Sequence, residues 1–136
     1  MQENDLQGIR HTLAHLLACS VRNLFPGAKN TIGPAIEDGF YQDFDVSGVS
    51  EKDLPRIEKE MRKVLKTWGE FERREVTVED ALKEFEWNEY KSELIRDLAR
   101  ESKTISFYVI GGFVDLCKGG HANDARIIDP DAFKLT

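Results

Sequence analysis

The first twenty-five residues place apolar side chains at helical intervals. These side chains recur every three or four positions over residues 5–25, and rotation by about 100° per residue gathers them on one side of a helix; they are Leu6, Ile9, Leu13, Leu16, Leu17, Val21 and Leu24. The same rotation puts His11 and His15 opposite that stripe, one turn apart. We therefore expect a helix that ends before Pro26-Gly27 and turns this histidine pair away from the core.

The pattern then changes to short runs typical of β-strands. Residues 31–36 and 40–46 flank Asp38-Gly39, and both of these residues tolerate the positive φ of a tight turn. The pattern predicts a β-hairpin that turns at Asp38-Gly39.

A second helical period follows the hairpin. Ser50 and Asp53 form a capping box ahead of apolar residues that keep a helical spacing to about Gly69. Residues 71–76 read as a strand, and Thr77 with Asp80 repeats the capping pattern before a short helix.

The last part of the chain combines one more helix with a second hairpin. Leu94, Ile95 and Leu98 predict a helix over residues 92–100. Residues 104–110 and 113–117 are rich in β-branched and aromatic side chains and meet at Gly111-Gly112. We expect a single α+β domain over residues 1–136, with helices packed on a mainly antiparallel sheet.

Composition narrows the class of protein. Apolar residues make up 40% of the chain and charged residues 32%, which is typical of a folded globular protein rather than a disordered one. No run approaches the roughly 20 apolar residues of a membrane span, and the acidic amino terminus does not resemble a secretory signal, so we expect a cytoplasmic location. A reducing compartment would keep Cys19 and Cys117 as thiols, with Cys19 an inert, partly buried one.

Charge limits the mode of nucleic-acid binding. A net charge of −6 argues against tight nonspecific attachment to a phosphate backbone. Residues 52–66 hold six basic side chains interleaved with acidic ones, so this helix offers either a local basic face or a solvated surface of ion pairs.

All histidines of the chain fall in two short motifs. His11 and His15 stand four residues apart on the first helix, and Cys117 and His121 have the same spacing at the end of the last strand. The four side chains could hold a zinc ion or move protons without a metal, and the spacing does not choose between these. Asp115 shares a strand face with Cys117.

Four segments of the sequence, which include both histidine motifs, resemble in order and content the editing domain of bacterial threonyl-tRNA synthetases. That domain is a relative of the alanyl-tRNA synthetase editing domains. The resemblance runs from about Ile9 to Leu135. It is carried by residues 10–17, 31–44, 89–92 and 115–121, in the order of the family. One position differs, because the family usually has Gly-Pro before the last histidine where this chain has Gly119-Gly120.

The resemblance implies a hydrolase that removes serine wrongly esterified to threonine tRNA, since a pocket made for threonine cannot strongly reject its smaller analogue. Its partners would be the acceptor end of that tRNA and the remaining domains of a synthetase, of which we expect the chain to be a fragment. The residues that match the catalytic positions of the family are His11, His15, Lys91, Asp115, Cys117 and His121. Tyr41 and Asp43 match positions that line the pocket.

The expected chemistry is attack by a positioned water on the ester carbonyl. His11, His15 or His121 would orient or deprotonate the water, Asp115 would hold the serine, and Lys91 would stabilise the oxyanion or a ribose hydroxyl. Cys117 as a nucleophile is a lower-ranked route. Without the resemblance, Lys91 and Asp115 would read as surface ion-pair partners.

Two alternatives stay open at this level. The resemblance favours a site without a cofactor, whereas the related alanine-specific proteins hold zinc through the same pattern, which would here be His11, His15, Cys117 and His121. Zinc-dependent editing of mischarged alanine tRNA is therefore one rival. A module that binds the acceptor end without catalysis is another.

Overall fold

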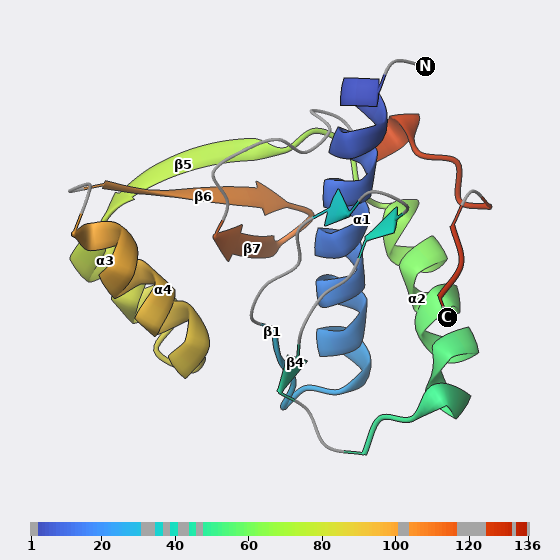
Figure 1. Cartoon of the computed structure of the whole chain (residues 1–136), viewed down its shortest axis with the longest axis horizontal. Helices are drawn as coiled ribbons and strands as arrows, with labels where there is room; N and C mark the ends of the chain where they lie inside the picture. Colours follow the sequence, from blue (N-terminus) through green and yellow to red (C-terminus); the bar gives the residue numbers. More distant parts are fainter. Residues whose placement is uncertain are drawn as a thin grey trace. The chain divides into compact units, whose positions relative to one another are not determined.

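The structure is a computed structural model, and it describes residues 3–30, 35–36, 39–40, 44–45, 48–100, 104–116, 125–131 and 133–135. Over these residues the chain has four α-helices and antiparallel strands, which confirms the expected α+β class (Figure 1). The chain divides into two compact units, Met1–Glu70 with Gly120–Thr136 and Phe71–Gly119. None of the described helices combines the length and the hydropathy needed to span a bilayer.

Two helices form the centre of the first unit. Helix α1 (Glu3–Leu24) packs against α2 (Leu54–Leu65). Helix α1 is buried on several sides and not only along its apolar stripe. The hydroxyls of its buried Thr12 and Ser20 donate to the carbonyls of Gly8 and Leu16, each at 2.8 Å. These bonds satisfy polar groups that would otherwise be costly to bury.

Short strand pairs occupy the segment between the two helices. Strand β1 (Lys29–Asn30) pairs with β4 (Phe44–Asp45), and β2 (Ala35–Ile36) pairs with β3 (Gly39–Phe40), both antiparallel. The pairing of β2 with β3 confirms the predicted hairpin. Gly39, expected in the turn, lies in β3 opposite Ile36.

Helix α2 begins at the predicted capping box and is shorter than predicted. A single 3₁₀ turn, η1 (Glu51–Asp53), precedes it, and the Ser50 N–H donates to Asp53 Oδ2 at 2.8 Å. The helix ends at Leu65 rather than near Gly69, while Trp68 is buried beyond its end. Burial of Trp68 therefore does not require it to be helical.

The carboxyl-terminal segment is attached to α2 by Arg62. The guanidinium donates from Nε to the Pro130 carbonyl at 3.0 Å and from Nη2 to the Phe133 carbonyl at 3.4 Å, and it lies over the Phe133 ring. A short 3₁₀ helix, η2 (Ala125–Ile127), is joined by its Ala125 N–H to the Gly69 carbonyl.

The second unit contains a three-stranded antiparallel sheet of β5 (Glu72–Thr77), β6 (Thr104–Ile110) and β7 (Phe113–Leu116), in that spatial order. Gly111 and Gly112 connect β6 to β7 with φ of 54° and 84°, values that favour glycine. The second predicted hairpin is confirmed. Its last strand ends, among the described residues, at Leu116.

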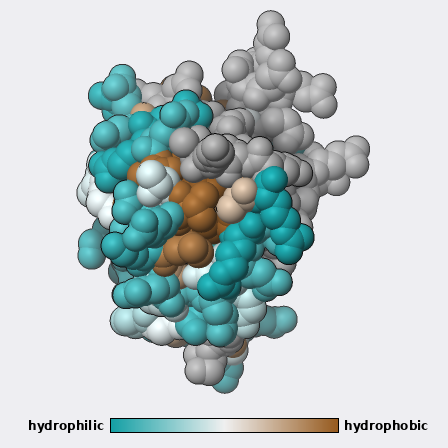
Figure 2. All heavy atoms as spheres, turned by 90° about the vertical axis from the view of Figure 1, so that its left-hand side faces the viewer, coloured by the Kyte–Doolittle hydropathy of each residue, from teal (hydrophilic) through white to brown (hydrophobic). Residues whose placement is uncertain are grey.

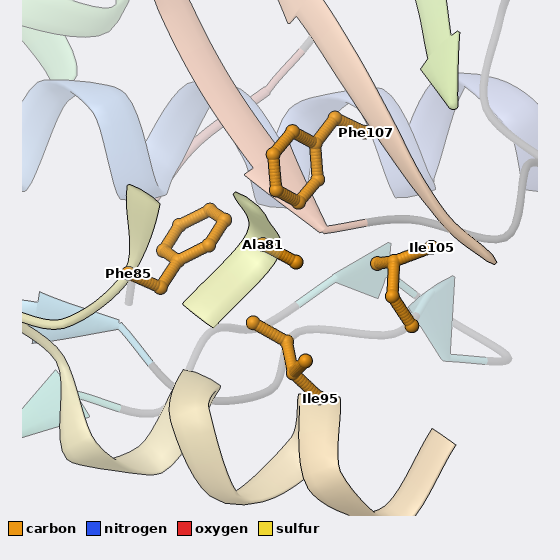
Figure 3. Packing of buried hydrophobic residues seen from close by; sticks show 5 residues of the cluster. All are labelled: Ala81, Phe85, Ile95, Ile105 and Phe107. Atoms are coloured by element: carbon orange, nitrogen blue, oxygen red, sulfur yellow. The ribbon is translucent and has the colours of Figure 1, made fainter. Parts of the chain in front are cut away.

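Helices α3 (Val78–Glu84) and α4 (Glu89–Ala99) pack on one face of this sheet. Their core is shown in Figure 3, where the labelled side chains point toward one another; they are Ala81, Phe85, Ile95, Ile105 and Phe107. The Phe85 and Phe107 rings meet edge to face at 5.3 Å. Figure 2 shows the side of the molecule that lies at the left in Figure 1, where a hydrophobic patch is bordered by hydrophilic side chains.

Candidate functional site

Lys91 and Asp115 form a buried ion pair in the second unit. Lys91 comes from the first turn of α4 and Asp115 from β7, an edge strand of the sheet. Lys91 Nζ lies 3.0 Å from Asp115 Oδ1, and the two residues are only 5% and 3% exposed. The Leu116 N–H also donates to Asp115 Oδ1, at 2.8 Å. The fold thus places two opposite charges, 24 positions apart in sequence, in direct contact away from solvent.

The burial of Lys91 and Asp115 contradicts the interpretation of each as a surface residue. From sequence alone each could be a surface ion-pair partner, but both are buried and they pair with each other. A surface pair contributes little because water screens it, whereas a buried pair interacts strongly after a large desolvation cost.

The position of Lys91 is fixed by the N-cap of α4, which the sequence pattern did not predict. Asn88 is fully buried, and its Oδ1 accepts the N–H groups of Tyr90 at 3.1 Å and Lys91 at 3.3 Å. Ser92 Oγ donates to the Phe85 carbonyl at 3.0 Å. These bonds start α4 at Glu89, three residues before the predicted start, so Lys91 lies within the helix. The local signal was present, because asparagine is a preferred N-cap residue.

The second pair of candidate residues lies on α1 in the first unit. The rings of His11 and His15 stack with their centroids 4.9 Å apart and their planes at 21°. The predicted sharing of one helix side is confirmed, but the prediction that both face away from the core is wrong. His15 is only 6% exposed, while His11 is half-buried. Helix α1 contacts α2 and also strands β2 and β3, so more than one of its sides is covered.

The remaining candidates lie outside the described residues. These are Tyr41, Asp43, Cys117 and His121. Within the part of the chain that the structure describes, no three histidine, cysteine, aspartate or glutamate side chains are grouped to hold a metal ion. The two stacked histidines alone do not complete the four-ligand set of a structural zinc site, so the fit for zinc depends on Cys117 and His121.

Cys19, on α1, is a poor candidate for nucleophilic chemistry. Burial raises the pKa of its thiol from 9.0 to about 11, with a further rise from nearby Glu60 and opposing effects of Arg22 and Asn23. The thiolate is the reactive form of cysteine, and this site disfavours it near neutral pH. The expectation of an inert buried thiol is in line with this environment.

Comparison with known proteins places the chain beside one kind of enzyme. No protein-family model matches it. The chain is similar to curated proteins named threonine--tRNA ligase: it is 50% identical to that of Acetivibrio thermocellus over 136 residues, covering 98% of this chain and 21% of the relative. For Borreliella afzelii the identity is 44% over 136 residues, covering 99% and 23%.

A third relative, from Desulforapulum autotrophicum, is 50% identical over 113 residues, which cover 83% of this chain and 18% of the relative. The chain therefore spans about a fifth of the length of these curated relatives. The similarity fits one domain of such a synthetase and does not by itself identify which domain.

Proposed function

We propose that this chain is the editing domain of a threonine--tRNA ligase and that it hydrolyses serine wrongly esterified to threonine tRNA. The similarity to threonine--tRNA ligases over nearly the whole chain supports the family context. The sequence blocks that resemble the editing domain of that family support the choice of domain. In this setting the chain would work in the cytoplasm, with the tRNA acceptor end and the rest of the synthetase as partners.

The observation that carries the proposal is the buried pair of Lys91 and Asp115. Both residues match catalytic positions of the editing family, and the fold brings them into contact from separate elements. Buried ion pairs are weak sources of stability, because well-packed apolar side chains often serve as well or better. An arrangement of two opposite charges held in a water-poor position is therefore better explained by substrate chemistry than by folding.

The pair has groups suited to both ends of an aminoacyl ester. An ammonium has three N–H donors, and the contact with Asp115 uses one of them. Lys91 would direct another toward the oxyanion that develops on the ester carbonyl, or toward the adjacent ribose hydroxyl. Asp115 would hold the serine amino or hydroxyl group. A positive charge held in place before the reaction stabilises the transition state more than one that must reorient.

Water activation is assigned to histidine. A neutral imidazole can accept a proton from water near neutral pH, and its unperturbed pKa suits this task. His11 and His15 would orient or deprotonate the water, or His121 would do so. Covalent attack by Cys117 stays a lower-ranked route.

Selectivity would come from the size of the amino-acid pocket. Serine and threonine both carry the hydroxyl group, so a synthetic site for threonine accepts serine at an appreciable rate. A second site that is too small for the extra methyl group of threonine would hydrolyse the serine ester alone. Tyr41 and Asp43 would contribute to this pocket.

Selective ester hydrolysis is the direct test. The chain is mixed in excess with threonine tRNA charged with either serine or threonine, and ester loss is followed under single-turnover conditions with and without a metal chelator. We expect fast loss of the serine ester, slow loss of the threonine ester and no effect of the chelator. Equal rates for the two esters would contradict the proposed editing function, and loss that stops with the chelator would favour the zinc-dependent alternative.

A further inference from the structure

Helices α3 and α4 pack on one face of the sheet of the second unit, and the opposite face is buried at its β7 end, at Ile110, Phe113 and Asp115. The helices pack against the face that carries Ile105 and Phe107. Side chains alternate between faces along a strand, so Tyr108 points to the other face. The strand register places Arg73 of β5 and Asp115 of β7 directly opposite Tyr108, on either side of it. We call these three residues the Arg73 row.

Exposure falls along the Arg73 row toward the ion pair. The Arg73 side chain is 55% exposed at the outer edge of the sheet, Tyr108 is half-buried, and Asp115 is buried against Lys91. Adjacent strands lie about 4.8 Å apart, so the row covers roughly 10 Å from Arg73 to Asp115.

Neighbouring contacts orient Arg73 and Tyr108. The Phe71 ring meets the Tyr108 ring edge to face with centroids 6.5 Å apart. Arg73 Nη2 donates to Ser106 Oγ at 3.0 Å and pairs with Glu75 Oε1 at 2.9 Å. An aromatic ring and a guanidinium are thus held next to each other, beside the buried pair.

We propose that the Arg73 row binds the single-stranded 3′ end of tRNA and guides it to Lys91 and Asp115. Tyr108 would stack with an unpaired base, and Arg73 would contact a backbone phosphate. Aromatic stacking and arginine contacts are the usual means by which proteins bind single-stranded nucleic acid. This inference rests on the proposed function, because it takes the buried pair to be the place where the ester reacts.

Glu75 sets the strength of the phosphate contact. In the free protein it neutralises Arg73, which fits the weak affinity expected of an acidic chain. A phosphate would have to compete with this carboxylate for the guanidinium. Removal of the Glu75 charge should therefore tighten binding of the RNA end.

A matched control is present on the same strand. Arg74 is adjacent to Arg73, its side chain is 53% exposed, and it also pairs with a glutamate, Glu72. Because neighbouring strand residues point to opposite faces, Arg74 lies off the Arg73 row. Arg73→Gln and Arg74→Gln thus remove the same charge from equally exposed positions, and they differ in the face that they affect.

The experiment measures binding of the 136-residue chain to a hairpin RNA with the acceptor stem and single-stranded 3′ end of threonine tRNA, labelled at its 5′ end. We expect Arg73→Gln to weaken binding and to lower the slope of log affinity against log salt by about 0.7, the value for one contact to a single-stranded phosphate. Tyr108→Ala should weaken binding at least about fivefold, as for loss of one base stack. Glu75→Gln should tighten it about twofold, and Arg74→Gln should have little effect.

Binding and hydrolysis separate this inference from the proposed function. If Arg73→Gln and Arg74→Gln weaken binding equally, or if neither they nor Tyr108→Ala changes it, the Arg73 row is not the binding surface, even where the serine ester is still hydrolysed. Absence of RNA binding by the unmodified chain also overturns the inference. If the expected pattern of binding is found but the serine ester is stable, the Arg73 row is supported as the binding surface and the proposed hydrolysis is contradicted.

Discussion

A lysine ammonium buried beside a carboxylate makes each residue dependent on the other. Desolvation of either charge costs several kcal/mol, and the short contact between Lys91 and Asp115 offsets that cost. Loss of one partner leaves the other as an uncompensated charge in a water-poor place. The energetics of the pair therefore differ from those of the exposed ion pairs elsewhere in the chain, such as Lys83 with Glu79.

Lys91→Met should lower the free energy of unfolding by about 3 kcal/mol, because Asp115 keeps its charge without a partner. Adding Asp115→Asn to this variant should restore part of the loss, since it removes the unpaired charge. Urea unfolding of the two single variants and the double variant measures this coupling. Lys83→Met, on an exposed pair, serves as the control and should change stability by less than about 0.5 kcal/mol. Additive losses in the double variant would contradict a coupled buried pair.

Cys19 should make stability depend on alkaline pH. Burial raises the pKa of its thiol from 9.0 to about 11, so between these values the folded chain keeps a proton that the unfolded chain has lost. Stability from this group is complete below pH 9 and falls as the pH rises toward 11, by up to about 3 kcal/mol. Urea unfolding of the unmodified chain and of Cys19→Ala between pH 8 and pH 11 measures the difference. Parallel stability curves for the two proteins would show that Cys19 does not titrate in this way.

At the scale of the elements, the start of α4 determines where Lys91 lies. The Asn88 side chain accepts two N–H groups of the first turn, and this cap is fully buried. Lys91 is three residues from the cap, so a shift in the helix start would move its ammonium away from β7. Asn88 acts on the site through Lys91 and is a positioning residue.

Asn88→Ala should lower the free energy of unfolding by about 1 kcal/mol and should reduce kcat for the serine ester more than it changes KM. Asn88→Asp, which keeps an oxygen acceptor at the cap, should recover most of both losses. Unfolding and ester hydrolysis are measured on the two variants at a temperature at which both are folded. A loss of stability without any change in kcat would show that the cap has only a structural role.

Local signals in the sequence predicted many of the elements but not all of their ends. Thr77 caps α3 as expected, with its Oγ1 accepting the Asp80 N–H at 3.2 Å, and Gly111-Gly112 forms the expected turn. Such features depend on a few neighbouring residues, which a sequence shows directly. The helical period continued past Leu65 to Trp68, although the helix does not, because a buried residue after a helix has the same pattern as a buried residue within it.

At the scale of the whole molecule, burial depends on contacts that the sequence does not show. Helical periodicity assumes one buried face, but α1 is covered by α2 and by the β2–β3 hairpin, and for this reason the exposure expected for His15 was wrong. The contact of Lys91 with Asp115 likewise depends on packing between α4 and the sheet. The candidate residues were identified by resemblance, and their pairing required the fold. The single domain over residues 1–136 stays a prediction. Within the structure, the chain divides into two compact units.

The central claim is that the buried pair acts on the serine ester, and the rate of ester loss with and without Lys91 tests it most directly. The measurement compares single-turnover hydrolysis of serine-charged threonine tRNA by the unmodified chain, by Lys91→Met and by the exposed control Lys83→Met, with folding of each verified by circular dichroism. Loss of one preorganised charge at the oxyanion should slow the reaction by about 100-fold or more in Lys91→Met, and Lys83→Met should match the unmodified chain. A folded Lys91→Met variant that hydrolyses the serine ester at the unmodified rate would contradict the claim.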